Sequence, residues 1–544
     1  MKKWLRVAIV ASLALFANSS ASAQVLKIAP DLLGLLNLNN LFTPVIVQYQ
    51  APPTSLDILT LQLLGGVVNQ TFSAFPAVLV QLPAVNLLTV ANIANVTYLS
   101  PDRSLAGMLD NTPQTVNAPL AWQSGLTGTG IGIAVIDSGI ANHPDLQSNG
   151  LSRVVYHQSF NGSSTSDLYG HGTHVAGIIG GNGNSSTGQN YIRTFKGIAP
   201  NVSLIDLRVL DQNGAGSDSM VIAAIQKAIS LKTKYNIRVI NLSLGRAIYE
   251  SYHFDPLCRA VQAAWKAGIT VVVAAGNLGR NGYATITSPG NTPEVITVGA
   301  MKNMGTPGRG DDQIASYSSR GPSFIDLVAK PDLVAPGNLT NSLLASGSTL
   351  STQYPANVLP SSYYSTTNAP SQYFRLSGTS MATPVVSGAA ALLLQKSPSL
   401  TPDTVKARLM KTATKSFPAY STATDPATGA TYTDTYNLFT VGAGYLDINA
   451  ALASTDSATK PALSPVTAYD AGSGSAYIIT DNSAVWGTSA VWGTSAVWGT
   501  TVFVNGTSAI WGSSAVWGTS AVWGTSAVWG TSAVWGTTSG NGEN

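Results

Sequence analysis

Three residues of the chain could together activate a hydroxyl group, and each stands among small residues. Asp137 ends the apolar run 131–136, and His171 lies in the stretch Gly-His-Gly-Thr-His-Val-Ala-Gly. Ser380 follows much later, in the stretch Leu-Ser-Gly-Thr-Ser-Met-Ala-Thr-Pro. A serine becomes a strong nucleophile when a histidine takes its proton, and an acid can orient that histidine. The order Asp, His, Ser is one of three chain orders known for such a triad.

The three segments together resemble the active-site motifs of the subtilisin-like serine proteases, the subtilases. The resemblance covers roughly residues 115–452 and is specific because three motifs occur in the right order. It implies a serine endopeptidase that cleaves peptide bonds through an acyl-enzyme, with Ser380 as nucleophile, His171 as base and Asp137 as orienting acid. It also implies that Asn277, after the run Val-Val-Val-Ala-Ala-Gly, supplies a side-chain amide to the oxyanion hole.

The substrate is expected to bind as an extended peptide between two chain edges, through main-chain hydrogen bonds. The segment after a predicted strand at 239–242 resembles one edge in the family, and a Gly-Ala-Gly stretch resembles the other. The expected substrate-binding residues are Ser243, Leu244, Gly245, Gly214, Gly216 and Gly276. Arg246 stands where many relatives have another glycine. This departure argues against the open, apolar specificity pocket that is usual in the family.

No cofactor is expected for the chemistry, but structural calcium is an open question. Asp145 matches a residue that ligates calcium in many subtilases, so it is the candidate calcium ligand. The companion loop 180–196 is rich in Gly, Asn and Ser, whose oxygens could bind calcium, but it lacks the family spacing. His174 lies near His171 without the glutamate of a zinc motif, so packing or hydrogen bonding is expected for it.

The residues around these motifs predict an α/β fold. Apolar runs that read as buried parallel strands occur at 131–136, 203–207, 239–242 and 271–274. Helical patterns at 221–231 and 257–267 alternate with them, which indicates a mostly parallel, subtilisin-like sheet with helices on both faces. Functional residues of such sheets lie at the carboxyl ends of strands, where Asp137 stands.

Residues 1–109 precede this fold and contain two expected segments. Residues 1–23 read as a signal peptide, with a basic start, an apolar stretch and an Ala-Ser-Ala cleavage site, which predicts an extracellular protein. Residues 24–109 show a β-α-β-β-α-β pattern of a small α+β, ferredoxin-like domain. This segment resembles the inhibitory propeptides of subtilases, which implies a self-processing zymogen; a permanent structural domain is the alternative.

The composition argues against a nucleic-acid-binding protein, a disulfide-bonded protein and a protein that spans a membrane. The chain has 544 residues, 44% of them hydrophobic and 10% charged, with a net charge of +3, and this balance does not predict nucleic-acid binding. The single cysteine, Cys258, excludes an intrachain disulfide, and it is expected to be a small buried side chain. No apolar run reaches the roughly 20 residues that a membrane-spanning helix needs.

The C-terminal part has a different character. The peptidase domain is expected at 110–455, with an insertion of surface loops or short strands at 337–373, followed by a linker at 456–482. Residues 483–544 repeat the motif Ser-Ala-Val-Trp-Gly-Thr. Exposed tryptophans at this density mark an interaction or aggregation surface. Stacked strands or a short repeat solenoid, a patch that binds a polysaccharide or the cell surface, and a flexible adhesive segment are the alternatives for it. The repeats raise a second hypothesis, a non-enzymatic cell-surface or adhesion protein on a protease scaffold.

Overall fold

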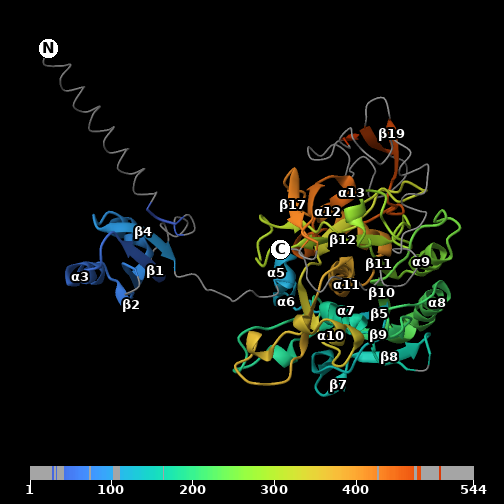
Figure 1. The fold of residues 1–544 in the computed structure, drawn as a ribbon, viewed down its shortest axis with the longest axis horizontal. Helices are drawn as coiled ribbons and strands as arrows, with labels where there is room; N and C mark the ends of the chain where they lie inside the picture. The colour runs from blue at the N-terminus through green and yellow to red at the C-terminus, as the bar shows by residue number, and fades with distance from the viewer. Residues whose placement is uncertain are drawn as a thin grey trace, which may run out of the picture. The chain divides into compact units, whose positions relative to one another are not determined.

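The computed structural model describes residues 27–29, 32, 42–72, 75–101, 111–162, 164–425, 428–470, 475–479 and 501–503. The chain divides into two compact units, 1–107 and 108–544 (Figure 1), and each is described by itself. The expected signal peptide at 1–23 lies outside the described residues, as does the expected repeat tail at 483–544 apart from 501–503. Both remain predictions.

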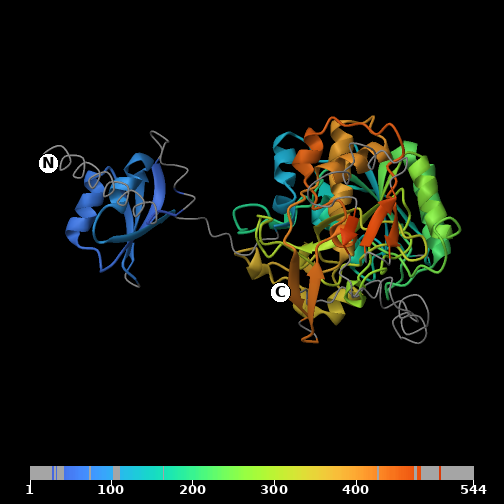
Figure 2. The ribbon, with the colours of Figure 1, turned by 90° about the horizontal axis from the view of Figure 1, so that it is seen from above.

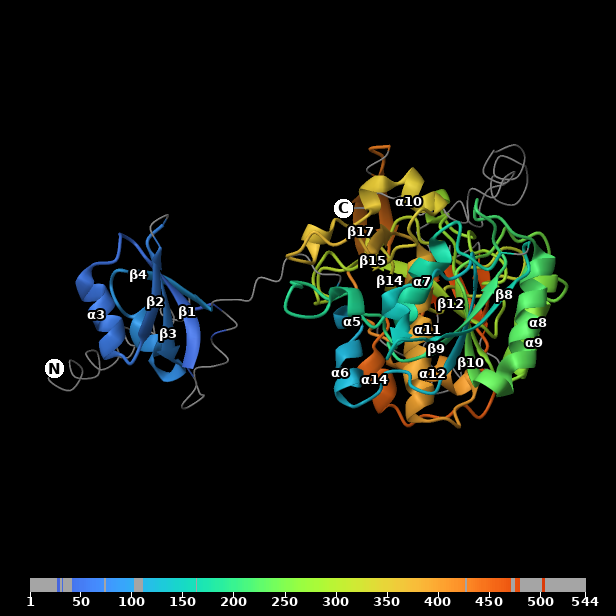
Figure 3. The ribbon, with the colours of Figure 1, turned by 90° about the horizontal axis from the view of Figure 1, so that it is seen from below.

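The described part of the first unit is a four-stranded antiparallel sheet accompanied by short helices. Its elements follow the expected order β1 (Phe42–Tyr49), α3 (Ser55–Leu63), β2 (Val67–Phe72), β3 (Ala77–Pro83), α4 (Leu87–Ala91) and β4 (Val96–Pro101). The strands are arranged β2-β3-β1-β4 (Figure 3). Alternate residues of β1 are buried, as expected for a sheet with one covered face. Thr54 and Asp57 form a capping box at the start of α3.

The second unit is built around a mostly parallel sheet. Its strands are β5 (Gly132–Asp137), β8 (Val154–Ser159), β9 (Ser203–Arg208), β10 (Ile237–Leu242), β11 (Thr270–Ala274), β12 (Ile296–Lys302), β13 (Gln313–Ile314) and β14 (Leu333–Pro336). The order is β13-β12-β11-β10-β5-β9-β8, with β14 also paired to β12. Only the pair β12–β13 is antiparallel within the described part of this sheet. The predicted α/β fold is confirmed.

Helices cover both faces of this sheet. On one face lie α8 (Asp218–Tyr235) and α9 (Pro256–Lys266), and on the other lie α7 (His171–Gly180) and α11 (Thr379–Lys396) (Figures 2 and 3). The remaining helices are α5 (Thr112–Thr115), α6 (Ala118–Gln123), α10 (Thr349–Gln353), α12 (Pro402–Thr412), α13 (Leu438–Val441) and α14 (Ile448–Ala453). Every residue of α7 is buried, which holds its first residue, His171, in a fixed place. No helix among the described residues combines the length and apolar character needed to cross a bilayer.

Several short strand pairs complete the second unit. They are β6 (Gln147–Ser148) with β7 (Leu151–Ser152), β15 (Thr340–Leu343) with β16 (Tyr373–Leu376), β17 (Tyr420–Thr424) with β18 (Thr431–Thr435), and β19 (Val466–Asp470) with β20 (Ser475–Ile479) and β21 (Thr501–Phe503). The insertion 337–373 does contain short structural elements, but all four residues of β15 are buried. Its ends therefore form part of the core rather than surface loops.

The segment expected as a linker, 456–482, is in contact with the second unit over its first part. Ser464 Oγ donates a hydrogen bond of 2.5 Å to Asp332, and its amide donates to the carbonyl of Pro293. Asp332 is buried between the ammonium groups of Lys330 and Lys406, at 2.6 and 3.2 Å. A buried carboxylate with these partners is fully hydrogen-bonded, and Ser464 fixes the segment to it.

Candidate active site

Asp137 and His171 form a buried hydrogen-bonded pair. Asp137 is the last residue of β5 and His171 the first of α7, and Nδ1 of His171 lies 2.8 Å from Oδ1 of Asp137. Burial disfavours the imidazolium, but the charge and hydrogen bond of Asp137, with a contribution from the charge of Asp167, raise the pKa of His171 above its ordinary value. The pair thus has the geometry of an oriented general base, with Nδ1 of His171 committed to Asp137.

Asp167 fixes this pair and was missed by the sequence reasoning. Its carboxylate accepts hydrogen bonds from Ser138 Oγ at 2.8 Å, from the amide of Gly170 at 2.7 Å, and from the amide and hydroxyl of Thr173 at 2.8 and 2.5 Å. Ser138 follows Asp137, and Gly170 precedes His171. Asp167 therefore connects the end of β5 to the start of α7. Only its position four residues before the histidine could have indicated this role.

Ser380 lies in the first turn of α11, whose capping residue is Gly378. Its Oγ donates a hydrogen bond of 3.1 Å to the carbonyl oxygen of Ser243, and Oγ of Ser243 donates at 2.8 Å to the carbonyl of Ser380. Nε2 of His171 makes no hydrogen bond to any described residue. Oγ of Ser380 is therefore hydrogen-bonded to Ser243 and not to His171 in this structure, and catalytic hydrogen bonds are often absent before substrate binds.

Asn277 is held beside the start of the same helix. Its Oδ1 accepts hydrogen bonds from the amide and the hydroxyl of Thr379, at 2.9 and 3.0 Å. Because Oδ1 is committed as an acceptor, the amide orientation is fixed and Nδ2 carries its two donor hydrogens. Thr379, another residue that the sequence reasoning missed, thus orients a donor next to Ser380.

The expected substrate-binding residues lie in the segments that follow β10 and β11 and in the segment between β9 and α8. Close internal packing explains why several of these positions are glycine. A Cβ on Gly214 would lie 2.7 Å from the ring of Tyr169, and a Cβ on Gly216 would lie 2.7 Å from the carbonyl oxygen of Val209. A Cβ on Gly276 would meet Thr287 and Ser319 at 2.8 Å. These positions need glycine for close internal contacts, whether or not substrate approaches them.

Both carboxylate oxygens of Asp145, the candidate calcium ligand, accept hydrogen bonds from the protein. Its Oδ1 accepts a hydrogen bond of 2.6 Å from the amide of Ser185, and its Oδ2 accepts one of 2.6 Å from the hydroxyl of Tyr373. In the adjoining loop, Oδ1 of Asn182 accepts a hydrogen bond of 3.1 Å from the amide of Asn184, and Nδ2 of Asn182 donates to the carbonyl of Gln147. Calcium needs six to eight oxygen ligands, and these oxygens already accept protein hydrogen bonds. No cluster of metal-ligating side chains occurs within the described ranges.

The stability of the protein should therefore not depend on calcium at Asp145. We expect the change in Tm between calcium-containing and chelator-containing buffer to be the same for the inactive variant Ser380→Ala and for Ser380→Ala with Asp145→Asn. Differential scanning calorimetry measures both values. A calcium-dependent rise in Tm that disappears with Asp145→Asn would instead establish Asp145 as a ligand.

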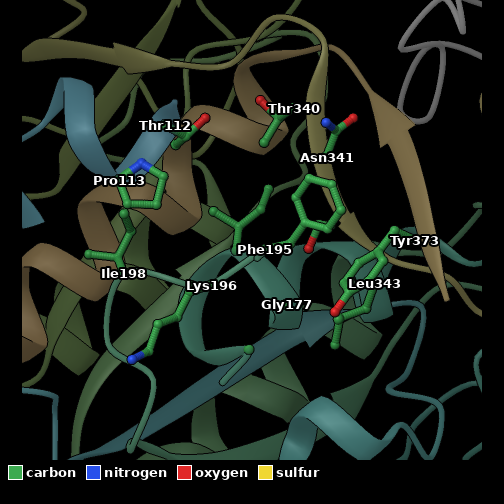
Figure 4. A pocket seen from close by; sticks show the side chains of 14 residues that line it. Thr112, Pro113, Gly177, Phe195, Lys196, Ile198, Thr340, Asn341, Leu343 and Tyr373 are labelled. Atoms are coloured by element: carbon green, nitrogen blue, oxygen red, sulfur yellow. The ribbon is translucent and has the colours of Figure 1, made fainter. Parts of the chain in front are cut away.

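A pocket lies beside Tyr373 and was not expected from the sequence (Figure 4). Residues of α5, α7, β15, β16 and the loop 195–198 line it, and Asp137, His171 and Ser380 are not among them. The ring of Phe195 lies 4.6 Å from the ring of Tyr373, so aromatic packing supports the Tyr373–Asp145 hydrogen bond. The pocket is thus separate from the candidate catalytic residues.

The remaining histidines and the cysteine have structural surroundings. Nε2 of His174 lies 3.1 Å from the carbonyls of Thr340 and Phe374, and burial lowers the pKa of His174 to about 3, which agrees with the expected packing role. His157 pairs with buried Asp206 at 3.0 Å, a partner that the sequence did not reveal. Cys258 is buried, and burial raises its pKa to about 12, so the thiol is unreactive.

Comparisons with known proteins identify the family of the chain. Residues 128–444 match the Subtilase family. The chain is 39% identical over 338 residues to the serine protease AprX of Bacillus subtilis, covering 60% of this chain and 71% of the relative. It is 33% identical over 355 residues to subtilisin E of Bacillus subtilis, covering 64% and 78%.

A similar solved structure is that of a cold adapted subtilisin-like serine proteinase, with 32% identity, 53% of this chain and 84% of the other covered, and a TM-score of 0.39. The family match spans more than half of the chain and includes all the segments that carry Asp137, His171, Asn277 and Ser380. The protein therefore belongs to the Subtilase family and is a serine-type endopeptidase.

Proposed function

We propose that the protein is a secreted endopeptidase in which Ser380, His171 and Asp137 act as the catalytic triad, and that it is made as a self-processing zymogen. The observation that carries the triad is the buried His171–Asp137 hydrogen bond of 2.8 Å, which joins the end of β5 to the start of α7, a helix that packs against the Ser380-bearing helix α11. Because the catalytic positions are all filled, an adhesion protein on an inactive scaffold is the less favoured function.

The mechanism follows from the roles of these groups. His171 takes the proton of Ser380 as Oγ attacks the scissile carbonyl, and later gives it to the leaving amine. Asp137 keeps the histidine in the tautomer with Nδ1 protonated and stabilises the imidazolium. The developing oxyanion accepts hydrogen bonds from Nδ2 of Asn277 and from the amide of Ser380 at the helix start. Water then hydrolyses the acyl-enzyme by the same proton transfers.

Replacement of Asn277 by alanine is expected to lower kcat by about 10²–10³-fold with a smaller change in KM, because the lost donor acts on the transition state; this magnitude was measured on a subtilisin. Steady-state kinetics on a chromogenic peptide measure the effect. Thr379→Val provides a related variant, since it removes only one of the two hydrogen bonds that orient Asn277 and should have a weaker effect. Equal kcat in Asn277→Ala and the wild type would contradict the oxyanion role.

The triad proposal is tested by covalent labelling. The purified protein is treated with a serine-directed phosphonate and digested, and the adduct is located by mass spectrometry. The proposal requires an adduct on Ser380 and loss of casein cleavage in proportion to labelling. Cleavage of casein without an adduct on Ser380 would assign the activity to another residue.

The zymogen proposal rests on the separate folded unit that precedes the peptidase unit. We expect the mature protein to begin near residue 110 and the Ser380→Ala variant to keep the first unit attached. N-terminal sequencing of both secreted proteins tests export and self-processing together. Identical N-termini in the two proteins would reject self-processing while leaving the triad proposal intact. Extended substrate binding at 243–245 and 214–216 and contact of the tail with a cell surface or polysaccharide are part of the same proposal.

A further inference from the structure

Arg246 follows the proposed substrate-binding segment 243–245 directly, and its backbone is held on both sides. Its amide donates a hydrogen bond of 2.8 Å to the carbonyl of Ser288, and the amide of Ser288 donates one of 2.7 Å back to the carbonyl of Arg246. Ser288 follows Thr287, the residue that packs against Gly276. The backbone of Arg246 therefore joins the segment 243–245 to the segment that lies behind Gly276.

The guanidinium group of Arg246 contacts two carboxylates on two different helices. Nε lies 3.0 Å from each oxygen of Asp218, Nη2 lies 2.8 Å from Oδ2 of Asp218, and Nη2 lies 3.0 Å from Oδ1 of Asp255. Asp218 is the first residue of α8, and only Ser217 separates it from the glycine edge at 214–216. Planar guanidinium groups hold two carboxylates in fixed directions, which a lysine ammonium cannot do.

Asp255 completes the network on the other side. It is fully buried at the start of α9, where it accepts the amide of Leu257 at 2.9 Å. Its second oxygen accepts the hydroxyl of Ser288 at 2.7 Å. Asp255 is thus shared by Arg246, Ser288 and α9, and the network has two negative charges against the one positive charge of Arg246. The cation is already neutralised within the fold.

From these contacts we propose that Arg246 is a positioning residue that sets the spacing between the two substrate-binding edges, 243–245 and 214–216. This inference rests on the proposed function, in which an extended peptide binds between those edges. A peptide that pairs with two edges at once depends on their separation, and Arg246 is connected to one edge through the chain and to the other through Asp218. The glycine found at this position in many relatives cannot make these bonds.

The positioning role proposed for Arg246 differs from the role of a specificity residue, which would bind a charged side chain of the substrate. Because Asp218 and Asp255 neutralise the guanidinium group, Arg246 does not provide a free cation for an acidic substrate side chain. The effect of Arg246 should therefore depend on how many substrate residues lie between the edges, and not on whether those residues are acidic. This distinction gives the inference a measurable signature.

The test compares Arg246→Gln, Arg246→Lys and the control Arg259→Gln. Arg259 is an exposed arginine of α9 whose guanidinium group donates a hydrogen bond to the carbonyl of His253. kcat and KM are measured on peptides with one to four residues before the scissile bond. We expect Arg246→Gln to raise KM for the longest peptide about tenfold, the size of one or two weakened main-chain hydrogen bonds. The effect should shrink as the peptide is shortened, and Arg246→Lys should lie between Arg246→Gln and the wild type.

A double-mutant cycle with Asp218→Asn separates positioning from a general loss of stability. The KM effects of Arg246→Gln and Asp218→Asn should not add, because both remove the same connection. The inference is overturned by equal KM values for Arg246→Gln and Arg259→Gln, by a loss that is independent of peptide length, or by a loss confined to acidic peptides. If the wild-type protein cleaves none of the peptides, the proposed function itself fails, and this result is distinct from a normal wild type with an unaffected Arg246→Gln variant.

Discussion

Replacement of Ser380 by alanine is expected to lower kcat by about 10⁶-fold, the loss measured for the corresponding change in a subtilisin. The variant keeps His171, Asp137 and Asn277 but has no oxygen to attack the scissile carbonyl. In this variant a water molecule must attack the carbonyl, and the oxyanion donors still stabilise that attack. The remaining rate is about 10³–10⁴-fold above that of the uncatalysed reaction in water. The concentration of each purified protein is determined by absorbance, and kcat values measured on a chromogenic peptide give the ratio.

Ser387→Ala is the matched control for this result. Ser387 is a buried serine on the same helix, and its Oγ donates a hydrogen bond of 2.8 Å to Asn241 rather than approaching His171. Its loss should lower Tm by leaving a buried amide oxygen without a donor, while kcat stays within a few-fold of the wild type. The nucleophile assignment is wrong if Ser380→Ala and Ser387→Ala lose activity to the same extent, or if Ser380→Ala retains most of its turnover.

The fold of the second unit was predictable because its strands are buried on both faces. Continuous apolar runs such as 271–274 carry that signal, and all five residues of β11 are indeed buried. The insertion 337–373 was less predictable because its polar composition is typical of surface loops. Its buried end depends on Tyr373, whose hydroxyl reaches Asp145 across 228 residues of sequence. A hydrogen bond between residues so far apart in the chain produces no recognisable pattern in the sequence around either residue.

The candidate site was predictable where a residue is part of a distinctive motif. The surroundings of His171 and Ser380 are distinctive, so their roles could be inferred from sequence, whereas Asp167 and Thr379 are common residue types whose roles depend on which atoms they contact. The role proposed for Arg246 could not be predicted for the same reason. The sequence shows that Arg246 departs from the family pattern, but only the structure shows that its guanidinium group contacts Asp218 and Asp255. Residues that position others are recognised through their partners.

Replacement of Asp137 by asparagine is expected to lower kcat by about 10⁴-fold near neutral pH, because the amide no longer favours the tautomer of His171 that accepts the serine proton. The same change should move the acid limb of the pH profile. The charge of Asp137 raises the pKa of His171 above its ordinary value, and only the neutral histidine is a base. The pKa should therefore fall in Asp137→Asn, so that the remaining activity persists to lower pH than in the wild type. Measurement of kcat/KM across a pH series gives the pH at which activity falls on the acidic side.

Stability gives an independent measurement of the same pair. The raised pKa means that the folded protein holds the His171 proton more tightly than the unfolded chain, so this stabilisation is fully present below the unfolded pKa of histidine and is lost as pH rises through the folded pKa. In an inactive Ser380→Ala background, Asp137→Asn should therefore reduce the free energy of unfolding more at acidic than at alkaline pH.

Asp206→Asn is the control for both measurements, because Asp206 is also a buried carboxylate paired with a histidine Nδ1, that of half-exposed His157. It should leave kcat and the acid limb of the activity profile nearly unchanged. An Asp137→Asn variant with the wild-type acid limb would mean that the ionisation controlling activity belongs to a group other than His171. A loss of kcat equal in Asp137→Asn and Asp206→Asn would mean that burial of the carboxylate, rather than its contact with the catalytic base, is what activity requires.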